Sequence, residues 1–319
     1  MQKLKDHLGR EIDYLRISIT DRCNLRCRYC MPADGVESKD HQEILSYEDI
    51  LRIVKIGIKL GIKKVRITGG EPLVRLGVED FISALNKLDL EDISMTSNAV
   101  LLAEKARELK KAGLKRINIS LDTLNPAKFK KISRRDNLSE VLNGIKAALK
   151  VKLNPVKLNV VVMRGINDDE LFDFIELTRK ENLSVRFIEY MPLGGEAKAE
   201  KFISSREIME LIKNRYKLLP SDIKGSGPAR YFKIEGAAGT IGFISALSEH
   251  FCSSCNRLRL TADGRFKPCL AGNQEIKIKA MTDAEIKIAY RQALQVKPVR
   301  HSLSFERQNY NRNMSQIGG

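Results

Sequence analysis

The sequence of 319 residues contains no tryptophan, only four histidines and few aromatic side chains of any kind. It has no run close to the roughly 20 uninterrupted apolar residues of a membrane-spanning helix, so we expect no membrane partner. The segment Met1–Arg10 is polar and charged and lacks the apolar core of a secretory signal, which predicts a cytoplasmic protein. Thiols stay reduced in that compartment, so the six cysteines are expected to bind metal rather than to form disulfides.

Acidic side chains are scarce relative to basic ones, which gives a formal net charge of +16. A surplus of this size is compatible with a nucleic-acid surface or with an enzyme whose pocket holds a polyanion. Lys and Arg are spread over the whole chain rather than gathered in a tail. Charge alone does not separate these interpretations, and a simply basic surface is the commonest case.

What the sequence does have is a group of three cysteines, Cys23, Cys27 and Cys30, at C-x3-C-x2-C spacing after an apolar strand. Soft thiolate ligands suit iron, and three of them can hold three corners of a [4Fe–4S] cluster. Nothing nearby supplies a fourth ligand, so one iron would stay open for a small molecule. The alternatives are a structural zinc site or a disulfide beside a spare thiol. Zinc sites usually have four ligands, which favours the cluster.

The other three cysteines, Cys252, Cys255 and Cys269, form a second triplet at C-x2-C-x13-C spacing. A zinc site here would need a fourth ligand, for which His250 is the nearby candidate. A second [4Fe–4S] cluster with an open iron matches the pattern of the first triplet better.

From residue 14 to residue 190, short apolar strands alternate with helical segments. Six such units with short connections predict a parallel sheet covered by helices, and a complete barrel would have eight. We therefore expect an α/β fold with an incomplete parallel barrel over residues 1–195. A C-terminal α+β segment over residues 196–319 would carry the second cluster. The predicted strands span residues 14–20, 63–68, 92–97, 116–121, 156–163 and 184–190.

The alternation within these strands places polar and apolar residues on opposite faces. The apolar set, such as Ile17 and Ile19, would meet the outer helices, because side chains alternate with a period of two. A polar, cationic barrel interior is costly unless it holds water or a ligand, so the pattern predicts a pocket for an anion. A shift of one residue in the strand bounds would exchange the faces, but five strands agree. The polar set is Arg16, Ser18, Thr20, Arg66, Thr68, Ser94, Thr96, Asn98, Asn118, Ser120, Asp122, Lys157 and Asn159.

The second strand ends at Gly69-Gly70-Glu71-Pro72, where glycine lets a ligand approach the main chain. Together with C-x3-C-x2-C, this motif resembles the radical S-adenosylmethionine superfamily. Within that superfamily, nearly the whole chain is similar to the GTP 3′,8-cyclase family of molybdenum cofactor biosynthesis. Further motifs that carry this resemblance are Thr20-Asp21-Arg22, Ser120-Leu121-Asp122, Asn159-Val160-Val161, Arg186-Phe187-Ile188-Glu189-Tyr190-Met191-Pro192, Asn256-Arg257-Leu258-Arg259 and Gly318-Gly319.

The resemblance implies a radical cyclisation of GTP with two [4Fe–4S] clusters and S-adenosylmethionine as cofactors. In this family, cleavage of S-adenosylmethionine gives a radical that takes hydrogen from ribose C3′, and C3′ then bonds to guanine C8. The product would be (8S)-3′,8-cyclo-7,8-dihydroguanosine 5′-triphosphate, which a separate cyclic pyranopterin monophosphate synthase consumes. An external electron donor and a possible homodimer are further implications.

The resemblance also implies roles for individual residues. The first triplet would hold the cofactor-binding cluster and the second triplet a cluster near the guanine base. Gly318 and Gly319 would reach back into the active site as catalytic residues. The S-adenosylmethionine contacts would be Tyr29, Gly70, Ser120 and Met191. The GTP contacts would be Arg16, Arg66, Thr96, Lys157, Arg257 and Arg259.

Two features depart from the family pattern or stay open. Ser97-Asn98-Ala99 stands where the family usually has Thr-Asn-Gly, so Ala99 is strained if this position needs a positive φ. Residues 270–282 have no assigned role.

Two alternative functions remain for the chain: a peptide-modifying radical enzyme with an auxiliary cluster, which usually has more cysteines, and a basic zinc-containing nucleic-acid binder. The latter predicts steep salt dependence of nucleic-acid affinity; we expect no nucleic-acid partner.

Overall fold

One twelve-stranded sheet runs through the computed structural model, which describes residues 3–37, 39–193, 197–221, 227–306 and 310–318. Among these residues the strand order is β12-β11-β10-β1-β2-β3-β4-β5-β6-β9-β8-β7. The first six strands pair in parallel with their chain neighbours. They are β1 (Tyr14–Ser18), β2 (Lys64–Thr68), β3 (Asp92–Ser97), β4 (Arg116–Ser120), β5 (Val156–Val162) and β6 (Leu183–Glu189).

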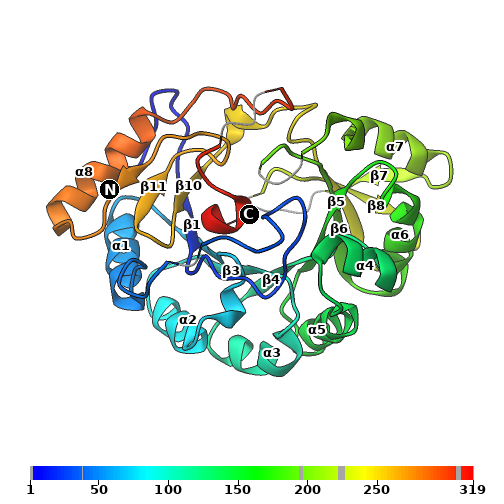
Figure 1. The fold of residues 1–319 in the computed structure, drawn as a ribbon, viewed down its shortest axis with the longest axis horizontal. Helices are drawn as coiled ribbons and strands as arrows, with labels where there is room; N and C mark the ends of the chain where they lie inside the picture. Colours follow the sequence, from blue (N-terminus) through cyan, green and yellow to red (C-terminus); the bar gives the residue numbers. More distant parts are fainter. Residues whose placement is uncertain (1–2, 38, 194–196, 222–226, 307–309, 319) are drawn as a thin grey trace.

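Helices cover the outer side of this sheet, which curves into an open arc rather than a closed barrel (Figure 1). The predicted incomplete barrel is therefore confirmed. Among the described residues, no helix is both long and apolar enough to cross a bilayer. The helices are α1 (Tyr47–Lys59), α2 (Val78–Asn86), α3 (Leu102–Lys111), α4 (Pro126–Ser133), α5 (Leu138–Lys150), α6 (Leu171–Lys180), α7 (Ser205–Lys213), α8 (Asp283–Gln295) and α9 (Met314–Ile317).

The C-terminal segment extends both edges of the sheet. At one edge β9 (Thr240–Ile244) is parallel to β6, followed by the antiparallel β8 (Arg230–Ile234) and β7 (Leu218–Pro220). At the other edge β10 (Arg257–Leu260) is parallel to β1, followed by the antiparallel β11 (Arg265–Lys267) and β12 (Ile276–Lys277). The strand–helix rhythm did not predict β9 and β10 as sheet members, because a loop with two cysteines joins them instead of a helix. The predicted domain boundary at residue 195 lies outside the described residues.

The apolar core lies between the sheet and the outer helices, as the alternation predicts. Ile17, Val65, Ile117 and Leu158 each have 0% exposure and belong to one continuous core cluster with the inner faces of the helices. Each such side chain contributes roughly 1.5–3 kcal/mol on burial. The apolar packing that stabilises the sheet thus lies on its outer side, which leaves the inner face available for polar residues.

Local sequence signals start and stop most helices. Ser46 caps α1 in a reciprocal capping box with Asp49, as expected from the Ser at this position. α4 was not predicted, although Asn125 and Pro126 signal its start. The Asn125 side chain accepts a hydrogen bond from the backbone N–H of Lys128, and Pro occupies the first helical turn.

Ala99 has a φ of +63°, so the strain expected from the missing glycine is present. This left-handed turn places the Ala99 carbonyl beside α5 at Gly144. A Cβ built on Gly144 would lie 2.5 Å from that oxygen and 3.1 Å from the Leu102 Cβ. A glycine at position 144 is therefore required by the backbone of the neighbouring turn, although glycine weakens a helix.

We expect Gly144→Ala to destabilise the protein by about 2 kcal/mol, because the new methyl group meets rigid backbone rather than a flexible side chain. Urea unfolding of the two proteins measures this difference. Asn143→Ala, on the exposed side of the same helix, should be neutral or stabilising by up to about 0.5 kcal/mol. Equal responses of the two variants would contradict the backbone contact.

Candidate active site

A cavity lies on the inner side of the arc, where the polar faces of the strands meet the loops at their carboxyl ends. Figure 1 shows α9, close to the chain end, inside the arc and next to these loops. Both the first cysteine loop and the tail residues Met314 and Ser315 line the cavity. The predicted site residues that line it are Arg16, Cys23, Cys27, Tyr29, Cys30, Arg66, Gly70, Thr96, Ser120, Met191, Arg257 and Arg259.

The first triplet lies on a turn in which the Cys30 and Met31 N–H groups both donate to the Cys27 carbonyl, at 2.9 and 3.1 Å. Burial raises the pKa of Cys23 to about 11 and that of Cys30 to about 12. Cys30 also lies beside the backbone N–H of Ser315, which favours its thiolate. All three side chains line the cavity and are partly exposed.

Three thiolates can bind either an iron–sulfur cluster or, with a further ligand, a single zinc ion. Thiolates on one zinc lie about 2.3 Å from the metal, so they must be close together. Among the described residues, the group of potential ligand atoms that converges within 4.8 Å is His250, Cys252 and His301. Neither cysteine triplet forms such a group by itself, so the described residues show no site of three thiolates around one zinc.

The Gly69–Pro72 motif packs against the first cysteine loop. A Cβ on Gly69 would lie 2.6 Å from the Thr20 carbonyl oxygen, and Gly69 has a φ of +152°. Gly70 is in similar contact with the backbone carbonyl of Arg22. The structural reason for these glycines is thus a close approach of two loops, beside the ligand access that the sequence suggested.

Glu71 of this motif anchors three neighbouring loops. Its carboxylate accepts hydrogen bonds from the Leu73 N–H (3.0 Å), the Ser97 hydroxyl (2.8 Å) and the Asn98 N–H (2.6 Å). The Asn98 amide in turn donates to Asn24 Oδ1 at 2.7 Å, which connects the anchor to the cysteine loop. Burial raises the pKa of Glu71 to about 7 despite these donors. The sequence motif gave no indication of this role.

Tyr29 and Asp122 form a second buried contact behind the first triplet. The Tyr29 hydroxyl donates to Asp122 Oδ2 at 2.6 Å, and the Val161 N–H donates to Oδ1 at 2.9 Å. Burial raises the pKa of Asp122 to about 6. The first triplet is therefore flanked by two buried carboxyl groups, Glu71 and Asp122.

Three arginines on adjacent strands form a row across the cavity, which we call the arginine row: Arg259, Arg16 and Arg66. The parallel register pairs Arg16 with Arg259 on one side and with Arg66 on the other. Burial lowers the pKa of Arg66 and of Arg259 to about 10. Burial, followed by the charges of Arg259 and Arg66, lowers the pKa of Arg16 well below its usual value. Like charges directly opposite each other are destabilising, so this row is arranged for an anion.

The sixth strand adds a cation that sequence analysis missed. Arg186 lines the cavity with 4% exposure, on the same strand face as Ser184, so the alternation in residues 184–190 could have revealed it. Lys157 is not among the described residues that line the cavity. It donates instead to the Tyr231 hydroxyl at 2.8 Å, and its predicted contact with GTP stays a prediction. Tyr231 lies on β8, and no sequence signal placed it here.

Several buried polar atoms facing the same space have no hydrogen-bond partner in the described part of the chain. They come from three strands of the arc, β3, β5 and β6. Unpaired buried polar atoms are rare in native proteins and indicate a missing polar ligand or water. These atoms are Thr96 Oγ1, Asn159 Oδ1 and Arg186 Nε.

The second triplet lies in cationic surroundings beside the start of β10. Burial alone would raise the pKa of Cys255, but the nearby charges of Arg257 and Lys297 lower it to about 6. Lys297 holds the loops together by donating to the carbonyls of Arg257 (2.8 Å) and Pro268 (2.7 Å). Cys252 lies in a short 3-10 turn, and its backbone carbonyl accepts a hydrogen bond from Arg10 Nη1 at 2.7 Å. The neighbours Phe251, Arg257 and Leu270 line the cavity.

Gly318, one of the two predicted C-terminal residues, reaches the arginine row. Arg259 Nη1 donates to the Gly318 carbonyl at 2.5 Å. Gly318 has a φ of +69°, and a Cβ there would collide with the Thr68 hydroxyl. Gly319 lies outside the described residues.

Comparisons with known proteins agree with this arrangement. Residues 17–178 match the Radical SAM superfamily and residues 183–303 match the Molybdenum Cofactor Synthesis C family. The GTP 3′,8-cyclase of Petrotoga mobilis is 52% identical over 98% of this chain and 99% of its own length. The enzyme of that name from Alkaliphilus oremlandii is 50% identical, over 99% of this chain and its full length.

Among solved structures, SuiB of Streptococcus suis bound to S-adenosylmethionine has a TM-score of 0.63 at 16% identity. The matched region spans 89% of this chain and 68% of the SuiB chain, and at this identity the likeness concerns the fold alone. The two family matches and the near-complete coverage at half identity decide the classification. The chain belongs to the radical SAM superfamily and, within it, to the GTP 3′,8-cyclase family.

Proposed function

We propose that the protein cyclises GTP to (8S)-3′,8-cyclo-7,8-dihydroguanosine 5′-triphosphate, the first step of molybdenum cofactor biosynthesis. The observation that carries this proposal is the arginine row, which lies in the same cavity as the first cysteine triplet. A triphosphate offers oxygens that guanidinium groups bind in pairs, and it would offset the repulsion within the row. The relatives at about half identity are named for this reaction.

Cys23, Cys27 and Cys30 would hold a [4Fe–4S] cluster at the mouth of the cavity. Together with S-adenosylmethionine, that cluster would supply a radical able to remove a hydrogen atom from ribose. Tyr29, fixed by Asp122, would orient the cofactor; the other cofactor contacts are Gly70, Ser120 and Met191.

The GTP contacts would divide between the two edges of the site. Arg16, Arg66 and Arg259 of the row, with Thr96 and Lys157, would bind the phosphates and ribose. Arg257 follows the second triplet and would hold the nucleotide near its base. A second [4Fe–4S] cluster on Cys252, Cys255 and Cys269 is supported by the cationic surroundings of Cys255 and by the match of residues 183–303 to the Molybdenum Cofactor Synthesis C family. Gly318 and Gly319 would complete the site from the tail.

The proposed reaction also involves other proteins. The reaction requires an external electron donor, and a cyclic pyranopterin monophosphate synthase would consume the product. A homodimer is a further possible arrangement. The peptide-modifying alternative and the zinc-containing nucleic-acid binder are less consistent with the relatives.

Anaerobic reconstitution tests this function. We expect about eight irons per chain from two cubane clusters, and conversion of GTP only when S-adenosylmethionine and a reductant are present. Product mass and iron content are the measurements. Cleavage of S-adenosylmethionine without consumption of GTP would contradict the substrate, and loading of zinc in place of iron would contradict the reaction class.

We expect Arg66→Met to weaken GTP binding by about 10- to 100-fold, since it removes charge-assisted hydrogen bonds to phosphate. The same change should leave the urea stability of the metal-free protein unchanged or higher, because it removes a buried charge beside Arg16.

Arg116→Met is the matched control on the next strands of the sheet. Arg116 forms a two-point ion pair with Asp92 at 2.8 and 2.6 Å, and it is not among the described residues that line the cavity. This variant should lose about 2 kcal/mol of stability and keep its GTP affinity. If Arg66→Met destabilises the protein as Arg116→Met does, the row is not a strained anion site.

A further inference from the structure

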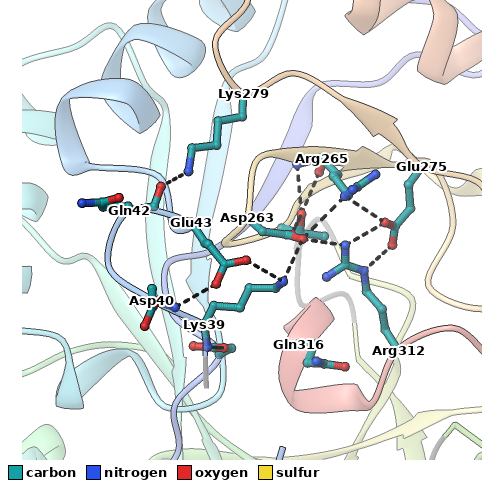
Figure 2. A network of polar contacts seen from close by, with 12 residues as sticks. Lys39, Asp40, Gln42, Glu43, Asp263, Arg265, Glu275, Lys279, Arg312 and Gln316 are labelled. Atoms are coloured by element: carbon teal, nitrogen blue, oxygen red, sulfur yellow. Dashed lines mark hydrogen bonds and ion pairs between the residues drawn. The ribbon is translucent and has the colours of Figure 1, made fainter. Parts of the chain in front are cut away.

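Arg312 is held by two acidic residues of the sheet edge near β10. Its Nε donates to Glu275 Oε1 at 2.6 Å, and its Nη2 donates to Glu275 Oε2 and to Asp263 Oδ2, each at 2.8 Å (Figure 2). The three side chains are only 10–12% exposed. Two-point pairs of this kind, shielded from water, are stronger and more specific in geometry than surface ion pairs. We call Arg312, Asp263 and Glu275 the tail clamp.

The tail clamp joins segments that are far apart in the sequence. Asp263 lies between β10 and β11, and Glu275 lies in the stretch 270–282, just before β12. Lys39, from the loop that follows the first triplet, approaches Asp263 at 3.8 Å, and its N–H donates to Asp21 Oδ2 at 3.0 Å. Figure 2 shows these side chains converging on Asp263. The clamp therefore lies where the first cysteine loop, the second-triplet segment and the tail meet.

The residues immediately after Arg312 enter the cavity. Asn313 and Gln316 cap α9 reciprocally, and Ser315 and Ile317 are 2% and 3% exposed. Ser315 presents its N–H to Cys30, and the Gly318 carbonyl accepts from Arg259. A single short segment thus contacts both the first triplet and the arginine row.

Charge explains why this segment needs a clamp. Arg312 is the one charged side chain in residues 310–318, and it approaches a cavity that already contains the arginine row. Without a counter-charge, the tail would be repelled from the site that it completes. Burial alone would raise the pKa of Asp263, but its contact with Arg312 holds that pKa below its usual value, consistent with a stable ion pair.

We propose that Arg312 is a positioning residue: with Asp263 and Glu275 it docks the tail so that Gly318 reaches Arg259 during GTP cyclisation. This rests on the proposed function, and it gives the stretch 270–282 a role as the tail's docking site. None of the three clamp residues is among the described residues that line the cavity, so the clamp acts through the placement of Ser315 and Gly318. A protein with a released tail would still cleave S-adenosylmethionine but convert less GTP per cleavage.

The test uses Arg312→Gln and Glu275→Gln, which break the same pair from opposite sides. Hydrogen exchange of residues 310–318, followed by mass spectrometry, should become at least about tenfold faster in both variants, in the metal-free and the reconstituted protein. The ratio of GTP converted to 5′-deoxyadenosine formed should fall to a similar extent in both. Arg312→Lys, which keeps the charge, should retain part of the protection and of the ratio.

Arg164→Gln is the control, because it removes an arginine from a pair with Glu207 that is 46% and 44% exposed. It should change neither tail exchange nor the product ratio. Unchanged exchange in the clamp variants, or faster exchange with a normal product ratio, would overturn the proposal. Loss of iron from both clamp variants would also overturn it, since their effect would then come from the second cluster. If the unaltered protein does not convert GTP, the proposed function fails, while the exchange result still decides whether the clamp holds the tail.

Discussion

The repulsion within the arginine row is the constraint that the rest of the structure must compensate for. Three guanidinium groups lie side by side on β10, β1 and β2, and of the described carboxylates none lies within 4 Å of Arg66 or Arg259. Such a row is unfavourable in the empty protein, and the apolar packing behind the same strands must compensate for it. The alternation of the strands separates these two tasks: the outer face supplies stability and the inner face supplies binding.

The two cysteine triplets lie in opposite electrostatic surroundings, and the fold produces this contrast. The first triplet follows β1 and is flanked by Glu71 and Asp122, which the ends of β2 and β4 bring together. In the second triplet, Cys252 and Cys255 precede β10, Cys269 follows β11, and Cys255 lies beside Arg257 and Lys297. Because β10 pairs with β1 in parallel, Cys252 and Cys255 lie at the opposite end of these strands from the first triplet, which follows β1, and the arginine row lies between them. One pairing therefore determines both the distance and the polarity between the two candidate metal sites.

The sequence predicted the features that have a local or periodic signal. The bounds of the first six strands agree to within two residues, and the inner polar face follows from alternation alone. β10 was missed as a sheet member because its pairing with β1 is non-local and leaves no periodic trace. Tyr231 and the anchoring role of Glu71 were missed because they depend on contacts between distant segments. Arg186 had a signal, in the same alternation as the other five strands, and the strain at Ala99 was correctly expected from a single missing glycine. Assignments of individual ligand contacts stay predictions.

The pairing of β10 with β1 also sets an order for folding during synthesis. β1 emerges early with β2 as its neighbour, but its other edge stays open until residues 257–260 have been made. Non-local pairings of this kind form late, because the chain must close a long loop first. Arg259 therefore joins Arg16 and Arg66 only after strands β2 to β9 have been made. The least favourable contacts of the sheet thus form on strands that the apolar core already stabilises.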